Sequence, residues 1–110
     1  MKNRDIALEF IKSFCNANIN ALEPLLAADL QFKGPFHNFK SSKDYLESLS
    51  NDPPEKCQYN VLSVTENRES VVLFYKYQKP DCTILIAQLF KIDDQRIKEI
   101  VLVFDTREFA

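Results

Sequence analysis

The period of the apolar residues changes once along this chain, after Pro54, and that change constrains the fold more than any other feature. Before Pro54 the apolar residues recur every three or four positions, which is typical of amphipathic helices. After Pro54 they alternate with polar residues or form short apolar runs, which is typical of β-strands. Helices followed by strands predict an α+β fold, with helices covering one face of an antiparallel sheet.

Three helices are predicted before Pro54. Residues 4–17 carry an apolar stripe that includes Ile6, Phe10 and Phe14. Residues 20–28 open with a capping pattern, and Pro24 lies near the first turn, where proline is tolerated. The third helix begins at the capping-box pattern of residues 41–44 and ends before the two prolines at 53 and 54. A short strand at residues 30–33 is expected between the second and third helices.

Four strands are predicted after Pro54, with turns between them at residues 67–68, 80–81 and 93–95. Their approximate ranges are 57–66, 69–78, 83–92 and 97–105. Both faces of these strands are apolar. One face is expected to meet the helices, and the other would leave a large apolar patch in solvent. A homodimer formed through the sheet is the simplest way to cover that patch.

Length and charge exclude several classes of protein. The 110 residues are enough for one domain, expected to span residues 1–110. The formal charge of −2, with 14 basic residues scattered along the chain, gives no reason to expect a nucleic-acid partner. No apolar run approaches the roughly 20 residues of a membrane-spanning helix. Neither a nucleic acid nor a membrane is therefore expected as a partner.

The cysteines and the N-terminus indicate a cytoplasmic location. Cys15, Cys57 and Cys82 are odd in number and lack the spacing of a zinc site or a redox motif, which fits a reducing compartment. The first residues lead into an amphipathic helix and not into a signal peptide. A single His among scattered carboxylates offers no metal-ligand set, and one Gly cannot form a phosphate-binding loop. No metal and no cofactor are expected.

Three stretches carry a resemblance to a known family: residues 20–32, residues 33–46 and residues 97–105. In this order and spacing, the chain resembles the nuclear-transport-factor-2-like (NTF2-like, or SnoaL-like) family. The resemblance implies a cone-shaped domain, with three N-terminal helices packed on a strongly curved antiparallel sheet. The family includes isomerases, dehydratases, cyclases, hydrolases and non-catalytic binding modules, so the fold does not decide the function.

Comparison with ketosteroid isomerase, a chemically defined relative in that family, argues against its chemistry here. The resemblance places the catalytic base on Gly34, the proton-bearing carboxyl group on Gln88 and the helix-1 tyrosine near Ile11. Gly34 cannot abstract a proton, and Gln88 cannot supply an acid of raised pKa. Scytalone dehydratase-like chemistry uses more than one His, and this chain has only His37. Ketosteroid isomerase activity is therefore not expected.

Gln88 is the polar residue that most strongly indicates a ligand pocket. It interrupts an apolar strand face that includes Ile86 and Phe90. An amide in such surroundings needs hydrogen-bond partners, which a ligand, a water molecule or the backbone can provide. Tyr75 belongs to a neighbouring strand and either lines the same pocket, faces a dimer partner or packs in the core.

His37 and Asp105 are the candidates for acid–base chemistry. His37 follows Gly34-Pro35-Phe36 at the expected mouth of the cone, and histidine titrates near neutral pH. Its alternative is a surface residue without a role. Asp105 ends the last strand, where it faces the pocket mouth or forms a salt bridge with Arg107.

Two functions follow from these residues. The first is a homodimeric domain that binds a small, mostly apolar molecule, with any catalysis being proton transfer or hydrolysis. The proposed ligand contacts are His37, Tyr75, Ile86, Gln88, Phe90 and Asp105. The second is a non-catalytic dimeric interaction domain whose pocket is filled by Phe and Leu side chains. The identity of the ligand and the existence of catalysis stay open at this level.

Overall fold

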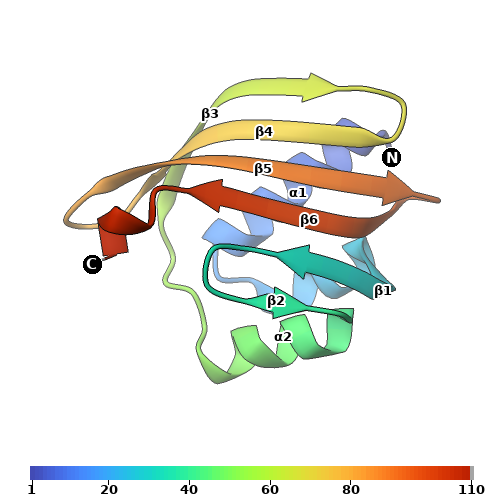
Figure 1. Cartoon of the computed structure of the whole chain (residues 1–110), viewed down its shortest axis with the longest axis horizontal. Helices are drawn as coiled ribbons and strands as arrows, with labels where there is room; N and C mark the ends of the chain where they lie inside the picture. Colours follow the sequence, from blue (N-terminus) through green and yellow to red (C-terminus); the bar gives the residue numbers. More distant parts are fainter. Residues whose placement is uncertain (110) are drawn as a thin grey trace.

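A computed structural model of the chain describes residues 1–109, in which helices pack on one face of a six-stranded sheet (Figure 1). The elements in order are α1 (Asn3–Cys15), the 3₁₀ helices η1 (Ile19–Ala21) and η2 (Glu23–Leu25), β1 (Leu26–Lys33), β2 (Asn38–Phe39), α2 (Ser42–Asn51), β3 (Gln58–Glu66), β4 (Ser70–Gln78), β5 (Thr83–Asp93), β6 (Arg96–Phe104) and the 3₁₀ helix η3 (Thr106–Phe109). The predicted α+β class and the switch from helices to strands are confirmed.

The sheet is mixed, so the prediction of an antiparallel sheet is wrong. Its strand order is β2-β1-β6-β5-β4-β3. The strands β3 to β6 follow one another as antiparallel neighbours, and the last of them returns beside β1, with which it runs parallel. The period of a strand does not indicate which distant strand becomes its neighbour. The parallel pairing of β1 with β6 joins an early and a late part of the chain. The predicted strong curl is also not observed.

The predicted second helix at residues 20–28 is wrong. The chain forms the short helices η1 and η2 there, and Leu26 already pairs with Ile97 of β6. Pro24 lies in the first turn of η2, where its missing N–H is tolerated, so proline alone does not exclude a longer helix. Pairing with β6 instead takes the residues after Leu25, although Leu22, Leu25 and Leu26 are buried as a helical stripe would predict.

The capping signal at Ser41 and the turn signal at residues 93–95 formed as predicted, whereas the capping pattern at residues 20–23 formed no side-chain cap. The Oγ of Ser41 accepts a hydrogen bond from the N–H of Asp44 at 3.1 Å, which satisfies a free donor in the first turn of α2. Asp94 and Gln95 both have positive φ, 50° and 60°, as a two-residue type I′ hairpin between β5 and β6 requires. The four strands after Pro54 lie within one residue of their predicted ends.

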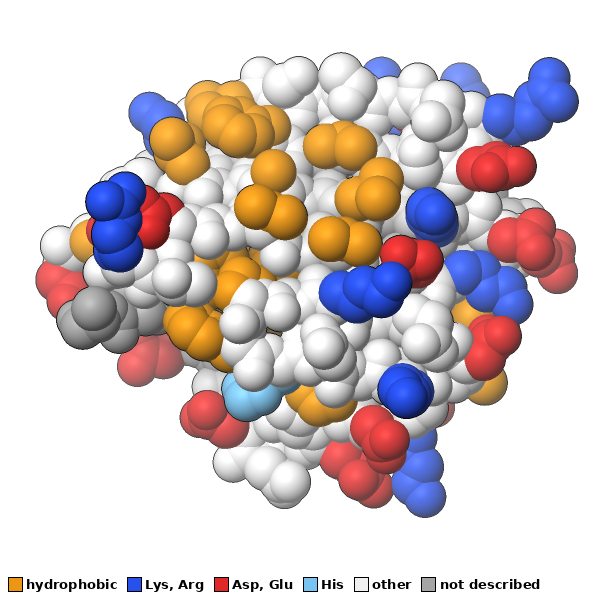
Figure 2. Space-filling view, viewed as in Figure 1, with side chains coloured by type: hydrophobic (Ala, Val, Ile, Leu, Met, Phe, Trp, Pro, Cys, Tyr) orange, Lys and Arg blue, Asp and Glu red, His pale blue; other side chains and the backbone are white. Residues whose placement is uncertain are grey.

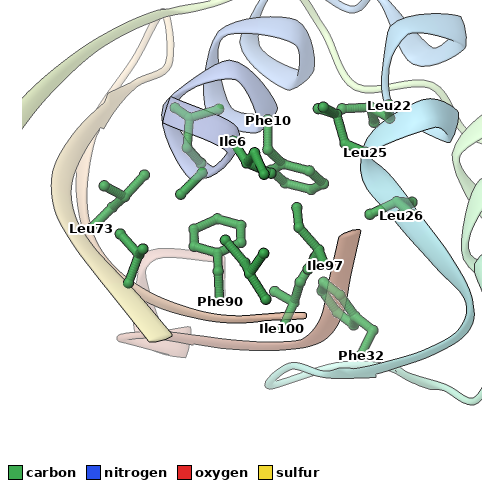
Figure 3. Packing of buried hydrophobic residues seen from close by; sticks show 14 of the residues in the cluster. Ile6, Phe10, Leu22, Leu25, Leu26, Phe32, Leu73, Phe90, Ile97 and Ile100 are labelled. Carbon is green, nitrogen blue, oxygen red and sulfur yellow. The ribbon is translucent and has the colours of Figure 1, made fainter. Parts of the chain in front are cut away.

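The core lies between α1 and the inner face of the sheet (Figure 3). Phe10 of α1 meets Phe90 of β5 edge-to-face, with ring centroids 5.3 Å apart. Leu73, Ile97 and Ile100 surround this pair and are fully buried. The apolar stripe of the first helix and one face of each central strand therefore bury each other, as the two periods predicted.

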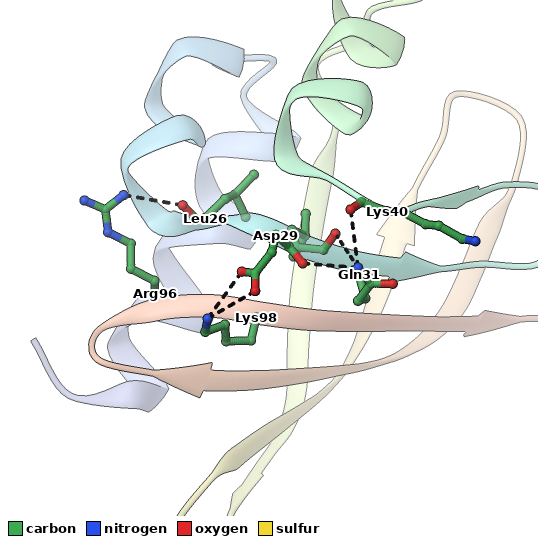
Figure 4. A network of polar contacts seen from close by, with 7 residues as sticks. Leu26, Asp29, Gln31, Lys40, Arg96 and Lys98 are labelled. Carbon is green, nitrogen blue, oxygen red and sulfur yellow. Dashed lines mark hydrogen bonds and ion pairs between the residues drawn. The ribbon is translucent and has the colours of Figure 1, made fainter.

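Side chains stabilise the irregular start of the β1–β6 pair (Figure 4). The register between these strands shifts between Leu26 and Gln31. A guanidinium nitrogen of Arg96 donates to the carbonyl of Leu26 at 3.4 Å, and the ammonium of Lys98 lies 3.3 Å from the Asp29 carboxylate. Gln31 Nε2 donates to the carbonyl of Lys40 at 3.3 Å, which links β1 to the segment before α2.

Candidate functional site: an aromatic cavity under the sheet

A cavity of about 280 Å³ opens on the inner side of the sheet. It lies where β4 and β6 end and β5 begins, at the left of the sheet in Figure 1. Its walls come from the second half of α1, from β1 with the loop to β2, from α2 and from the inner faces of β4, β5 and β6. Elements from both halves of the chain therefore close around it.

Aromatic rings make most of the wall. Tyr45 of α2 stacks on Phe32 of β1 at a centroid distance of 4.8 Å and meets Phe39 edge-to-face at 5.7 Å. Phe36 stands at the rim, 55% exposed, and its ring lies 5.7 Å from that of Phe104. Such a lining gives large, rigid apolar surfaces with few polar atoms.

Gln88 is the main polar group of the cavity. It is only 4% exposed, and its Oε1 accepts a hydrogen bond of 2.7 Å from the hydroxyl of Tyr75. Its Nε2 has no hydrogen-bond partner among residues 1–109, and no fully buried side-chain nitrogen or oxygen there lacks a partner. Gln88 is among the residues that line the cavity, so its amide is a hydrogen-bonding group of the cavity wall.

The tyrosines of the cavity are neutral at ordinary pH. Burial raises the pKa of Tyr75 well above its usual value, and it also raises the pKa of Tyr45. Burial and the neighbouring Cys57 together raise the pKa of Tyr77. No described Asp or Glu lines the cavity; its charged lining residue is Lys79, which follows β4, and the polar groups on the inner strand faces are neutral.

Four of the six predicted contact residues line this cavity. Tyr75, Ile86 and Gln88 form part of its deep wall, on β4 and β5. His37 lies at the rim in the exposed loop between β1 and β2, with its ring centroid 6.0 Å from that of Phe39. The backbone of this loop is held by a 3.0 Å hydrogen bond from the N–H of Gly34 to the carbonyl of His37.

The other two predicted residues lie elsewhere. Phe90 is on the same strand face as Gln88, but its side chain is fully buried against Phe10 and does not line the cavity. Asp105 is exposed and forms a bidentate ion pair with Arg107, at 2.6 Å for the closest atoms. This bond is also the main cause of the lowered pKa of Asp105. Of the two roles expected for Asp105, the structure therefore supports the salt bridge with Arg107 and not a place at the pocket mouth.

Tyr45, Phe32 and Phe39 are cavity residues that the sequence did not single out. Each is an apolar residue at ordinary helix or strand spacing, so the pattern treats it as packing. Only the contact of α2 with β1 and β2 brings the three rings together. No local signal would have separated them from core residues.

The three positions at which the resemblance places the ketosteroid isomerase groups all line the cavity: Ile11, Gly34 and Gln88. The resemblance therefore located the right space, although the residues there are different. A Cβ at Gly34 would lie 3.0 Å from a ring carbon of Phe32, which is too close for that ring to stay where it is. The packing of Phe32 in this chain is thus adapted to a residue without a side chain at position 34.

Solved structures share this architecture closely. An NTF2-like protein of unknown function from Cytophaga hutchinsonii matches with a TM-score of 0.85 and 26% sequence identity, covering 99% of this chain and 95% of its own. The chain has the NTF2-like fold. No protein-family model and no curated protein matches the sequence.

Two further structural neighbours carry functional descriptions. A putative SnoaL-like polyketide cyclase from Jannaschia sp. has a TM-score of 0.82 at 11% identity, covering 97% of this chain and 88% of its own. An LEH-like epoxide hydrolase from M. tuberculosis has a TM-score of 0.79 at 14% identity, covering 94% of this chain and 82% of its own. At these identities the likeness concerns the fold alone.

Two other observations bear on the sequence expectations. Among residues 1–109, no helix is both long enough and apolar enough to cross a membrane. Within the same residues, no group of three or more His, Cys, Asp or Glu side chains is arranged to hold a metal ion.

Proposed function

We propose that this chain binds a small, uncharged, mostly apolar molecule in the aromatic cavity, with a hydrogen-bond acceptor of the ligand placed against Nε2 of Gln88. The observation that carries the proposal is the donor itself. The Gln88 side chain is nearly inaccessible, and an amide nitrogen there that no described protein group accepts from is costly unless water or a ligand pairs with it. An aromatic cavity with one such donor has the composition of a small-molecule site.

The charge of the lining favours a neutral ligand. The deep polar groups are an amide and tyrosine hydroxyls whose pKa values are raised, so none of them is ionised near pH 7. An ion placed against these deep groups would lose its hydration without gaining a counter-charge there, because the charged residue of the lining, Lys79, follows the end of β4. A volume of about 280 Å³ lies near the small end of ligand sites, so a molecule with one or two rings suits it.

Any catalysis in this cavity would be proton transfer or hydrolysis. The structurally similar epoxide hydrolase and polyketide cyclase support this only by analogy of fold. With no described carboxylate in the lining and Asp105 paired with Arg107, His37 at the rim is the remaining general-base candidate. The proposal for this chain is binding, with His37 as the group to test for turnover.

A second copy of the chain is the proposed partner on the other side of the sheet. Large apolar side chains stand in solvent there, with exposures of 40% for Phe74, 52% for Leu85 and 57% for Val103. Phe74 of β4 and Val103 of β6 both pair with Ala87 of β5, so they flank this small residue on the same face of the sheet. Figure 2 shows hydrophobic side chains gathered over β4, β5 and β6. Such a patch is typical of an interaction surface.

The ligand proposal is tested with a matched set of probes: acetophenone, ethylbenzene and benzoate. The ketone offers an acceptor, the hydrocarbon has nearly the same shape without one, and benzoate adds a charge. NMR titration is expected to rank acetophenone first and benzoate last. Gln88→Leu is expected to weaken acetophenone binding by about 1–3 kcal/mol and to leave ethylbenzene nearly unchanged.

Two controls keep the test sharp. Gln88→Met also removes the donor, but with a side chain of a different shape from leucine. Asp105→Asn changes a polar residue outside the cavity. Equal affinity of the wild-type protein for the ketone and the hydrocarbon would refute the role of Gln88. If no probe shifts the resonances of cavity residues while the protein is still a dimer, the non-catalytic interaction domain becomes the better description.

A further inference from the structure

Two cysteines that are far apart in the sequence lie next to each other in the fold. Cys15 is the last residue of α1, and Cys57 immediately precedes β3. The backbone N–H of Cys57 donates a hydrogen bond of 2.9 Å to the carbonyl of Cys15. A direct backbone bond places the two residues side by side, and hydrogen-bonded pairs in antiparallel strands have Cα atoms about 5.5 Å apart, within the range that disulfides span.

The two thiols also interact with each other. The pKa of Cys15 is raised, first by burial and then by the charge and hydrogen bonding of Cys57. Burial, and after it the neighbouring Cys57, raise the pKa of Tyr77, whose ring lines the aromatic cavity. The Cys57 side chain is therefore near both Cys15 and a residue of the cavity wall.

The surroundings of the two thiols differ in access. Cys15 is 1% exposed, whereas Cys57 is partly exposed in a shallow groove that Asn16, Lys56 and Tyr59 also line. A reagent in solution can therefore reach Cys57 but not Cys15. This is the arrangement of an attacking cysteine with a resolving cysteine behind it.

We propose that Cys15 and Cys57 form a reversible disulfide, with a low-molecular-weight disulfide such as oxidised glutathione as the oxidant. The Cys57 thiolate attacks one sulfur of glutathione disulfide, forms a mixed disulfide and releases one glutathione thiolate. Cys15 then loses its proton, attacks the Cys57 sulfur and releases the second glutathione. The protein loses two electrons and two protons, and the reagent becomes two thiols.

The bond would tie the end of α1 to the start of β3. It closes a loop that contains β1, β2 and α2, which are the elements that form one side of the cavity. Closing a loop of this length restricts the unfolded chain strongly. It also converts the Cys57 thiol beside Tyr77 into a disulfide sulfur, which changes the surroundings of one residue of the cavity wall. In a reducing compartment, the thiol form is the resting state.

The test is oxidation of the whole chain with oxidised glutathione, followed by intact-mass analysis and peptide mapping. The wild-type protein is expected to lose two hydrogens, to keep one free thiol of its three cysteines and to yield a peptide pair joined through Cys15 and Cys57. Its melting temperature is expected to rise by roughly 10 °C and to return with dithiothreitol.

The single variants separate the roles. Cys15→Ser is expected to stop at the mixed disulfide on Cys57, and Cys57→Ser to leave Cys15 unmodified. Cys82→Ser is the matched control, because Cys82 lies in the turn between β4 and β5, and it is expected to form the disulfide as the wild-type protein does. A stable glutathione adduct on Cys57 of the wild-type chain, with Cys15 still free, overturns the proposal.

Discussion

The two faces of the sheet carry the same kinds of residue but differ in how far they are buried. The inner face of β5 presents Ile86, Gln88 and Phe90, all nearly inaccessible, and the outer face of the same strand presents Leu85, which is half exposed. The helices cover the inner face and leave it with both a packed core and a cavity. The outer face has no cover among the described residues. The difference shows that burial here depends on what packs against a strand and not on its own composition.

The inner face is itself divided along one strand. At Phe90 the facing ring of Phe10 fills the space, with centroids 5.3 Å apart. At Gln88, two residues earlier, the facing helix no longer fills it, and the space is the cavity. The predictions below test the contrast between the faces, starting with the largest expected effect.

Two phenylalanines on opposite faces give the largest contrast. Phe90→Ala is expected to lower the free energy of unfolding by about 3–5 kcal/mol, because it leaves a hole in a fully packed core. Phe74→Ala, on the outer face and 40% exposed, is expected to cost less than half as much when measured below the concentration at which a dimer forms. Urea unfolding curves measure both values. Equal losses would contradict the difference between the faces.

The hydrogen bond between Tyr75 and Gln88 gives the next effect. Gln88→Leu and Tyr75→Phe are each expected to cost about 1–2 kcal/mol of unfolding free energy, because each leaves a partner unpaired inside the protein. The double variant is expected to lose about 1 kcal/mol less than the sum of the two single losses. Additive losses in a double-mutant cycle would show that the 2.7 Å bond is energetically unimportant.

The buried tyrosines predict a loss of stability in alkali. Burial raises the pKa of Tyr45 in the folded state above its value in the unfolded state. Its contribution is therefore complete below the unfolded pKa, near 10, and is lost as the pH rises above that value. Between pH 9 and pH 11, Tyr45→Phe is expected to lose about 1 kcal/mol less stability than the wild-type protein. Identical pH profiles of the two proteins would mean that Tyr45 ionises freely while folded.

The outer face predicts the smallest effect on folding and a clear effect on assembly. Val103→Asp places a charge in the middle of the exposed apolar patch. The stability of the monomer is expected to change by about 0.5 kcal/mol or less, as is usual for exposed positions. The homodimer expected at micromolar concentration is expected to dissociate, because an unpaired charge cannot be buried in an interface at low cost. Light scattering gives the mass. A wild-type protein that is already monomeric contradicts the proposed dimer.

Local signals in the sequence predicted most of the elements, and the exceptions have a common cause. The caps at Ser41 and the turn at Asp94-Gln95 depend only on neighbouring residues, and both formed as predicted. The segment from Leu22 to Leu30 has an apolar pattern that suits a short helix as well as a strand. Pairing with β6, nearly seventy residues later, makes the second part of this segment a strand, and no local pattern carries that information.

The candidate site was predictable in part for the same reason. Gln88 stood out because an amide among Ile and Phe residues is unusual, and it lines the cavity. Phe90 was placed with it because both share a strand face, but the ring of Phe10 decides which part of that face is filled. The sequence also gave no indication that Cys15 and Cys57 are adjacent, since 41 residues separate two cysteines that the fold joins through one hydrogen bond.

The sequence by itself determined the helix-then-strand order, which residues of each strand share a face, and the abundance of aromatic side chains. These follow from periods of 3.6 and 2 residues and from side-chain chemistry, which are local properties. The tertiary structure decided which face the helices cover, that β6 pairs with β1 and where the core gives way to a cavity. Both faces of the strands are apolar enough to be buried, so only the packing of α1 and α2 against one of them distinguishes the inside from the outside.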